Sequence, residues 1–159
     1  MMALAMNGAT LAAGVESGNA FACEIYGQLR GEEGNIFCSP YSIHTALAMT
    51  YAGARGETAA QMAKASKFEQ NALITHRDAA ALVQRLNAIQ KEGTVKLAVA
   101  NSLWPQKGHP FLDGYLSLAR EYYSSEITPV DYVADAAGAC EAINEWVEDR
   151  TQGKIRDLI

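Results

Sequence analysis

An apolar segment from residue 40 to residue 54 constrains the fold of this chain more than any other feature. One helical face of the segment carries apolar or small residues at spacings of three and four, namely Ile43, Ala46, Leu47, Thr50, Tyr51 and Ala54. The other side is also small or apolar, with Ala48, Met49 and Ala52. A helix that is apolar nearly all round is usually buried. We therefore expect other elements to cover this helix on every side.

Local signals predict where this helix and its neighbours begin and end. Ser39 before Pro40 is typical of a helix start, with the serine as N-cap and the proline at the first helical position. Thr58 followed by Gln61 fits a capping box and predicts a second helix to about residue 67. Apolar periodicity predicts further helices around residues 21–29, 82–92, 110–123 and 139–150, the last of them stopped by Gly153.

Three segments have the pattern of strands. Residues 35–38 form a short apolar run between turn residues, which predicts a buried strand. Residues 95–104 alternate as a strand that should be covered on both faces. Residues 126–132 predict a further strand, which Pro129 places at a sheet edge. Helices and strands in this order, without a doubly wound nucleotide fingerprint, predict an α+β fold.

Composition excludes several classes of protein. The net charge of −5 argues against nucleic-acid binding, because phosphate contacts need a basic surplus. No stretch reaches the ~18 apolar residues of a membrane span, and the N-terminal residues lack the pattern of a signal peptide. Cys23, Cys38 and Cys140 match neither a disulfide framework nor a zinc site, so we expect small buried side chains.

Catalytic and metal-binding patterns are absent from the sequence. His44, His76 and His109 lie far apart and match no metal-ligand spacing. His44 is expected to be a hydrogen-bonded residue of the core or of a helix end. No nucleophile elbow, phosphate-binding loop or dinucleotide fingerprint occurs. We therefore expect no enzyme activity, no cofactor and no metal.

Three blocks of sequence contain residues that the helix and strand patterns do not account for, and all three resemble one protein family. The block NIFCSPYSIHTALAMTYAGARGETAAQM (35–62) resembles the strand and buried helix of the serpins. The block VANSLW (99–104) resembles the family's second strand of sheet A, and INEWVEDRTQGKIRDLI (143–159) resembles its helix F and the following loop. The blocks occur in the family's order, and the resemblance covers roughly residues 20–159.

The resemblance implies the fold, the domain and the activity. The fold would be serpin-like, with N-terminal helices packed on the first strands of a large sheet A and a strand of sheet B. Residues 1–159 would be the N-terminal part of a single serpin domain, incomplete because it stops before the third strand of sheet A. The complete protein would be a serine-type endopeptidase inhibitor whose reactive loop inserts into sheet A. That loop is absent from these residues.

Two functions of the family remain open in the sequence. The first is inhibition of a serine protease, or in some members a cysteine protease, as the partner. The alternative is a non-inhibitory serpin that acts as a carrier or chaperone. Small residues in the hinge before the reactive loop would favour the inhibitor. The family's habit implies the extracellular space, whereas the absence of a signal peptide in this chain leaves the cytoplasm open.

The resemblance also implies roles for five residues. Ser39 and Ser42 match the serines at the head of the buried helix, in the shutter region where sheet A opens. There a small hydroxyl can cap the helix and bond to the sheet. Ile143 and Trp146 are expected to face sheet A from helix F, and Asn101 is expected to hydrogen-bond across the sheet.

Overall fold

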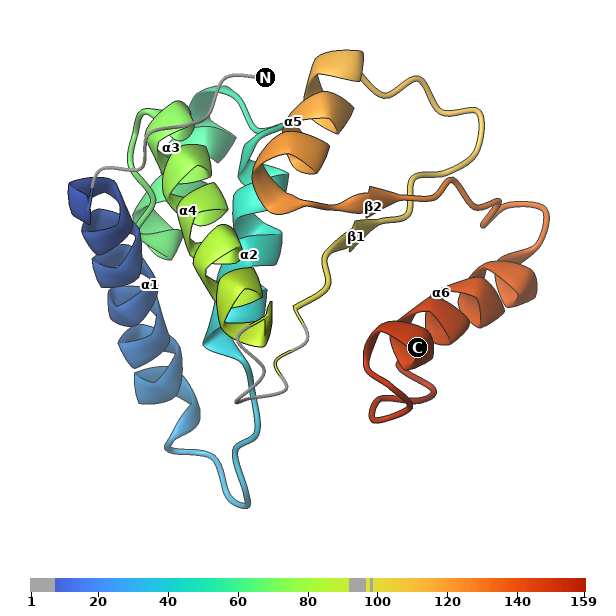
Figure 1. Cartoon of the computed structure of the whole chain (residues 1–159), viewed down its shortest axis with the longest axis horizontal. Helices are drawn as coiled ribbons and strands as arrows, with labels where there is room; N and C mark the ends of the chain where they lie inside the picture. The colour runs from blue at the N-terminus through green and yellow to red at the C-terminus, as the bar shows by residue number, and fades with distance from the viewer. Residues whose placement is uncertain (1–7, 92–96, 98) are drawn as a thin grey trace. The chain divides into compact units, whose positions relative to one another are not determined.

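The computed structural model describes residues 8–91, 97 and 99–159, which fall into two units (Figure 1). Unit 1 comprises Met1–Arg85, and unit 2 comprises Leu86–Ile159. Unit 1 is helical, with α1 (Gly8–Leu29), α2 (Pro40–Tyr51), α3 (Gly56–Ser66) and most of α4 (Ala72–Lys91). Unit 2 contains β1 (Ser102–Leu103), α5 (Asp113–Tyr123), β2 (Glu126–Ile127) and α6 (Ala136–Arg150).

The four helices of unit 1 enclose a common core. Helix α1 packs on α2 and α3, and α2 packs on α3. Helices α1 and α4 approach closely where Gly14 faces Asp78, because a Cβ built on the glycine would lie 2.7 Å from that of the aspartate. The core is made largely of small residues around a few aromatic ones, among them Phe21, Ala48, Met49, Tyr51, Ala63, Phe68, Ala80 and Val83.

Helix α2 starts as the sequence predicts, but its burial is one-sided. Ser39 has extended backbone angles, its side chain accepts a hydrogen bond from Ser42 N, and Pro40 occupies the first turn. Ala48 and Met49 are buried, whereas Ile43 and Ala46 are exposed. The prediction of a helix covered on every side is therefore wrong for the described residues. The helices of unit 1 cover one face of α2. The apolar composition of a helix does not indicate which of its faces contact other elements.

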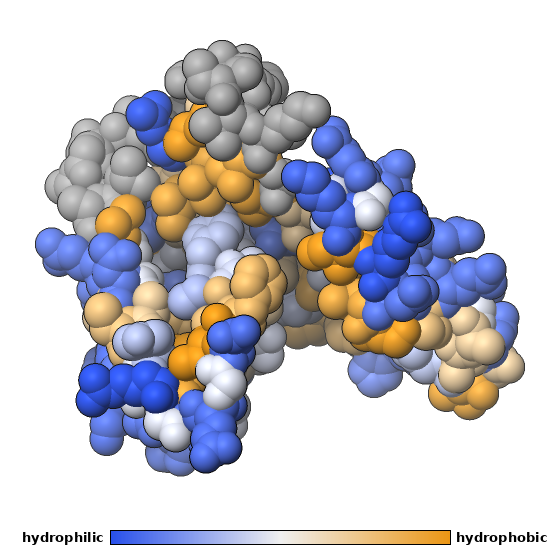
Figure 2. Space-filling view, turned by 90° about the horizontal axis from the view of Figure 1, so that it is seen from below, coloured by the Kyte–Doolittle hydropathy of each residue, from blue (hydrophilic) through white to orange (hydrophobic). Residues whose placement is uncertain are grey.

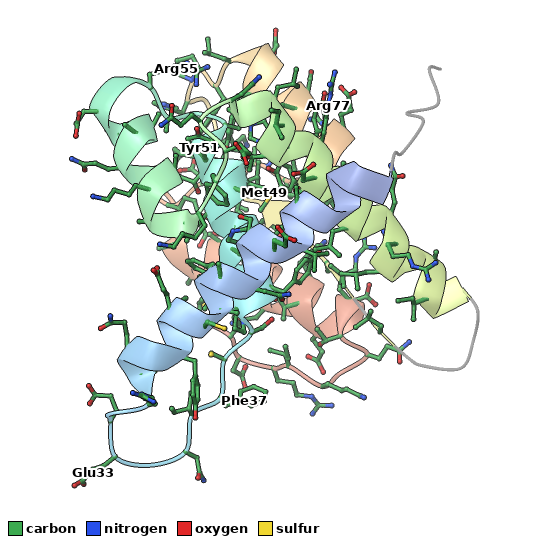
Figure 3. All side chains as sticks on the ribbon, turned by 90° about the vertical axis from the view of Figure 1, so that its left-hand side faces the viewer. Glu33, Phe37, Met49, Tyr51, Arg55 and Arg77 are labelled. Atoms are coloured by element: carbon green, nitrogen blue, oxygen red, sulfur yellow. The ribbon has the colours of Figure 1, made fainter. Side chains whose placement is uncertain are left out.

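Residues 35–38 do not form the predicted buried strand. Phe37 has a relative exposure of 102% and Ile36 of 41%, and none of the described strands pairs with this segment. In Figure 3, Phe37 lies on the connection between α1 and α2, away from the helices, while Met49 and Tyr51 lie among them. A strand needs a hydrogen-bonded neighbour, which an apolar run by itself does not provide.

Several predicted helix boundaries also move. Helix α3 begins at Gly56, with Arg55 as a cap that makes no side-chain bond, so the capping box at Thr58 is wrong. Helix α4 begins at Ala72, ten residues before the predicted start at residue 82. Helix α5 begins at Asp113 and not at Pro110, because the backbone turns at residues 109–112 before it becomes helical. Helix α6 ends at Arg150, and Gly153, with a φ of 73°, donates to the carbonyl of Glu148.

Unit 2 is built around a short parallel pair of strands. Ser102 pairs with Glu126 and Leu103 with Ile127, and an isolated bridge follows between Gln106 and Val130. Helix α5 supplies the crossover that parallel pairing needs. The predicted strands over 95–104 and 126–132 are thus reduced to two residues each, although residues 95, 96 and 98 lie outside the described part. Tyr123, at the end of α5, has a relative exposure of 0%.

Apolar side chains also reach the surface. Figure 2 shows hydrophobic residues beside strongly hydrophilic ones on the face it presents. The exposed large apolar residues include Tyr26 and Phe37 in unit 1 and Leu112, Val133 and Ile159 in unit 2. The three cysteines are free, with Cys23 and Cys38 exposed and Cys140 half-buried, so the prediction that they are buried is wrong. None of the described helices is long and apolar enough to cross a membrane.

Candidate functional site

The head of helix α2 brings Ser39 and Ser42 together. The two hydroxyl oxygens lie 2.9 Å apart, and Ser39 Oγ accepts a 3.3 Å hydrogen bond from Ser42 N. This geometry follows from the sequence, since an N-cap side chain reaches the amide three residues on. Both serines are exposed. Among the described residues, their side chains bond to each other and not to a strand.

His44, one turn further along α2, is held between two aromatic rings. Its ring centroid lies 4.9 Å from that of Phe21 and 4.7 Å from that of Phe68. His44 Nε2 lies 2.9 Å from the carbonyl oxygen of Ser66, at the end of α3. Burial lowers the pKa of His44, and the bond to Ser66 opposes that shift. The interpretation of His44 as a hydrogen-bonded core residue agrees with this position.

Asn101 joins the start of the strand pair to the end of α5. Its Nδ2 donates a 3.1 Å hydrogen bond to the carbonyl of Tyr123, and its own carbonyl accepts from Glu126 N at 3.1 Å. The side chain therefore bonds to the last turn of α5, and the backbone bonds to strand β2. Both bonds fix where the chain turns from the helix into the strand.

Trp146 and Ile143 lie on helix α6, with Trp146 against the strand pair. The indole Nε1 donates a 2.9 Å hydrogen bond to Glu126 Oε2, and Arg150 forms an ion pair with the same oxygen. The Trp146 ring meets the ring of Trp104 edge to face, with centroids 5.9 Å apart. The guanidinium of Arg150 lies over the Trp146 ring at 5.6 Å. Ile143 is buried.

A second set of contacts on α6 holds residues 158 and 159, and sequence reasoning missed it. Asn144 Oδ1 accepts from the amides of Leu158 at 2.8 Å and Ile159 at 3.1 Å. Asn144 Nδ2 donates to the carbonyl of Ile159 at 2.9 Å, and Cys140 Sγ donates to the same carbonyl at 3.0 Å. The side chain of Asn144 thus bonds to backbone groups of two residues, as a neighbouring strand would. Asn144, one of the two polar residues between Ile143 and Trp146, was the signal available in the sequence.

These contacts lie in two separate places, at the head of α2 in unit 1 and between α6 and the strand pair in unit 2. They are helix caps, side-chain and backbone hydrogen bonds, aromatic contacts and one ion pair at Glu126. Over residues 8–91, 97 and 99–159, no three His, Cys, Asp or Glu side chains gather around a position for a metal ion. In unit 2 the contacts connect α6 to strand β2 and the end of α5 to the residue before β1.

Comparison with known proteins connects this arrangement to one family. The family model described as "Serpin (serine protease inhibitor)" matches residues 16–159. An uncharacterized serpin-like protein of Thermococcus kodakarensis is 36% identical over 141 residues, which cover 89% of this chain and 33% of that protein. The leukocyte elastase inhibitor of Bos taurus is 43% identical over 126 residues, covering 79% and 32%. The chain thus spans about a third of the length of the curated relatives it matches.

Solved structures share the fold. Emu (Dromaius novaehollandiae) ovalbumin matches with a TM-score of 0.79 at 24% identity, over 94% of this chain and 41% of that one. Cleaved kallistatin matches with a TM-score of 0.72 at 26% identity, over 92% and 42%. The helix-rich structure with its small parallel sheet corresponds to an incomplete form of that fold.

Proposed function

Since this chain belongs to the serpin family, we propose that it forms the N-terminal part of a serine-type endopeptidase inhibitor. The observation that carries the proposal is the match of residues 16–159 to the family of serine protease inhibitors. Relatives named as leukocyte elastase inhibitors, at 39% to 43% identity, support a protease as the partner. The reactive loop that would select the protease is not among residues 1–159.

The proposed mechanism is that of a suicide substrate. A protease cleaves an exposed reactive loop, and the loop then inserts into sheet A as a new strand while the acyl-enzyme is trapped. Strand addition of this kind draws its free energy from main-chain hydrogen bonds along a sheet edge. The strand pair would belong to that sheet, and α6 would lie across it.

Contacts within this chain support a role for α6 in that mechanism. Trp146 and Arg150 both bind the carboxylate of Glu126, and Trp146 packs on Trp104. Strands beneath the helix cannot separate unless these contacts move with them or break. We propose that Ile143 and Trp146 hold α6 on sheet A, that Asn101 fixes the strand start, and that Ser39 and Ser42 act at the shutter.

The domain and the location are part of the same proposal. Residues 1–159 would belong to a single serpin domain, with units 1 and 2 as two parts of it. The reactive loop and the third strand of sheet A would lie outside these residues. An extracellular location follows the habit of the family, and a cytoplasmic location remains the alternative.

A covalent-complex assay tests the proposal. The protein is expressed with the residues encoded after Ile159 and incubated with trypsin-, chymotrypsin- and elastase-like proteases. A band stable in SDS, at the summed mass of serpin and protease, is expected with at least one of them. The same protease with its catalytic serine replaced by alanine should give no band, because no acyl bond can form.

Two further outcomes decide between the functions. Residues 1–159 alone should give no band, since the reactive loop is not among them. A folded full-length protein that is cleaved by every protease or ignored by all of them, without a covalent complex, contradicts the inhibitor proposal. That outcome would favour the carrier or chaperone alternative.

A further inference from the structure

Unit 1 contains a small cavity between α1, α2 and α4. Its volume is about 40 Å³, and its lining includes Tyr41, Ala48, Phe68, Asp78, Ala79 and Leu82. One water molecule needs ~10–15 Å³ by this measure, so the cavity has room for roughly three waters or a ligand of about three non-hydrogen atoms. The close approach of α1 at Gly14 forms part of its wall.

Two buried polar atoms of this cavity lack partners. Asp78 has a relative exposure of 5%, and its Oδ1 has no hydrogen-bond partner among the described residues. The hydroxyl of Tyr41 also lacks a well-formed hydrogen bond; burial raises the pKa of Tyr41, and the nearby Thr45 side chain opposes that rise. Buried polar groups are nearly always paired, because an unpaired one has lost its hydration without compensation. An orphaned carboxylate oxygen in a cavity therefore indicates a missing donor.

A positively charged donor would match the carboxylate of Asp78, which has no cation beside it among the described residues. Burial raises the pKa of Asp78, and the negative charge of Glu69 raises it further. No described cation offsets these two effects, since the ion pairs of unit 1 contain only Lys67 with Glu24. A cation placed at Asp78 Oδ1 would relieve both the desolvation and the repulsion.

The apolar part of the wall suits a short alkyl group. Ala48, Ala79 and Leu82 present methyl groups, and the ring of Phe68 lies on the same lining. The hydroxyls of Ser17 and Thr75, which also line the cavity, are already bonded to backbone groups of Lys67 and Glu69, so few free oxygen ligands remain for a hydrated inorganic cation. Transfer of an alkyl group from water to such an apolar lining is favourable, and an ammonium group can lie against an aromatic face.

We propose that this cavity binds a small primary alkylammonium ion of about three non-hydrogen atoms. Its N–H groups would donate to Asp78 Oδ1 and to the Tyr41 hydroxyl, and its alkyl group would lie against Ala79 and Leu82. The site is distinct from the protease-inhibitor proposal, because none of its lining residues lies in unit 2. Its test therefore succeeds or fails separately.

Ethylammonium chloride is the probe and is titrated into the 159-residue chain at constant ionic strength. A parallel titration with sodium chloride is the control. Saturation-transfer NMR on the ethyl protons measures affinity, and the ¹³C-carboxyl resonance of Asp78 reports the site. A ligand this small binds at best at a Kd of about 1 mM. Saturable transfer with a shift of the Asp78 resonance is expected, and sodium chloride should produce neither.

Matched variants separate the site from general charge effects. Asp78→Asn should weaken binding about 10-fold or more, because it removes a charge-assisted hydrogen bond. Glu32→Gln changes the charge equally on an exposed loop of the same unit and should leave the affinity unchanged. Ala79→Leu should abolish binding by filling the cavity while Asp78 stays. It also keeps the test valid if Asp78→Asn fails to fold.

Three results would overturn the proposal. The first is no saturation transfer up to ~100 mM, about a hundred times the tightest Kd expected. The second is equal transfer in the native chain and in folded Asp78→Asn or Ala79→Leu. The third is an Asp78 resonance that responds to sodium chloride as it does to ethylammonium, which would mean that the resonance reports salt in general and not a bound alkylammonium ion.

Discussion

Trp146 Nε1 donates a 2.9 Å hydrogen bond to Glu126 Oε2, so helix α6 is joined to strand β2 through one carboxylate. Arg150 binds the same oxygen. Because the two α6 residues share this acceptor, both lose a partner when Glu126 is replaced. Loss of either donor leaves the other bond in place.

We predict that Trp146→Phe and Glu126→Gln are non-additive. Each should lower the free energy of unfolding by ~1 kcal/mol, and the double variant should lose less than the sum by ~0.5 kcal/mol or more. The ion-pair part should be small and salt-sensitive, because both side chains are about half exposed. Urea unfolding followed by circular dichroism measures the cycle, with the exposed Glu145→Gln as control. Strict additivity would show that the bond contributes nothing.

Gly14 and Gly27 of helix α1 should respond to alanine in opposite directions. A Cβ at Gly14 would lie 2.7 Å from Asp78 Cβ, so Gly14→Ala should force α1 and α4 apart and cost ~1–3 kcal/mol. No atom lies within 4 Å of a Cβ at Gly27, where alanine should gain ~0.5–1 kcal/mol of helix stability. Thermal unfolding of the pair tests this. A stabilised Gly14→Ala protein would contradict the close approach.

His76 should make the protein less stable in mild acid. Its relative exposure is 2%, and burial lowers its pKa to about 4. An unfolded histidine titrates near ~6.5, so the unfolded state gains a proton first as the pH falls. Stability should drop between pH 6.5 and about 4, by ~2 kcal/mol at pH 5, and change no further through His76 below that range.

A pair of histidine variants isolates this contribution. His44, whose pKa burial also lowers, adds to the slope in the same direction, so the difference between variants is the quantity to measure. His76→Gln should flatten the dependence of the unfolding midpoint on pH between 7 and 5. The exposed His109→Gln should leave it unchanged. Parallel curves for the native chain and His76→Gln would refute the prediction.

Asn144→Ala should release residues 158 and 159 from α6. The variant loses three hydrogen bonds to that segment, each with a net value of ~0.5–1.5 kcal/mol. Hydrogen exchange at the amides of Leu158 and Ile159 should accelerate by about 10-fold or more, while exchange within α6 stays slow. Glu145→Ala, at the exposed neighbouring position, is the matched control. Unchanged protection in Asn144→Ala would show that other contacts hold the segment.

Ser42→Leu in the complete protein should destabilise the inhibitory state. Leucine adds bulk at the head of α2 at a typical cost of ~1–3 kcal/mol, and it removes the hydroxyl that lies 2.9 Å from Ser39 Oγ. Polymers on a native gel after mild heating are expected. Ser42→Ala removes the hydroxyl without the bulk and should polymerise less. An unchanged melting temperature without polymer would argue against a shutter role for Ser42.

The sequence by itself determined the features that depend on near neighbours in the chain. The Ser39-Pro40 pair predicts the start of α2, and the cap forms because its donor and acceptor are three residues apart. Gly153 likewise marks the end of α6, since a glycine adopts positive φ without strain. The motif blocks also identified the family, because their order and spacing carry information that no single element has.

Only the tertiary structure decided which of these elements find neighbours. Residues 35–38 are as apolar as a buried strand, yet Phe37 is exposed because no described strand lies beside it. Helix α2 is covered on one face alone, and Asn144 binds a segment 14 residues away. The orphaned oxygen of Asp78 arises where α1, α2 and α4 meet. Strand pairing, burial and cavities depend on contacts between residues distant in sequence. Local helix and strand propensities do not describe such contacts.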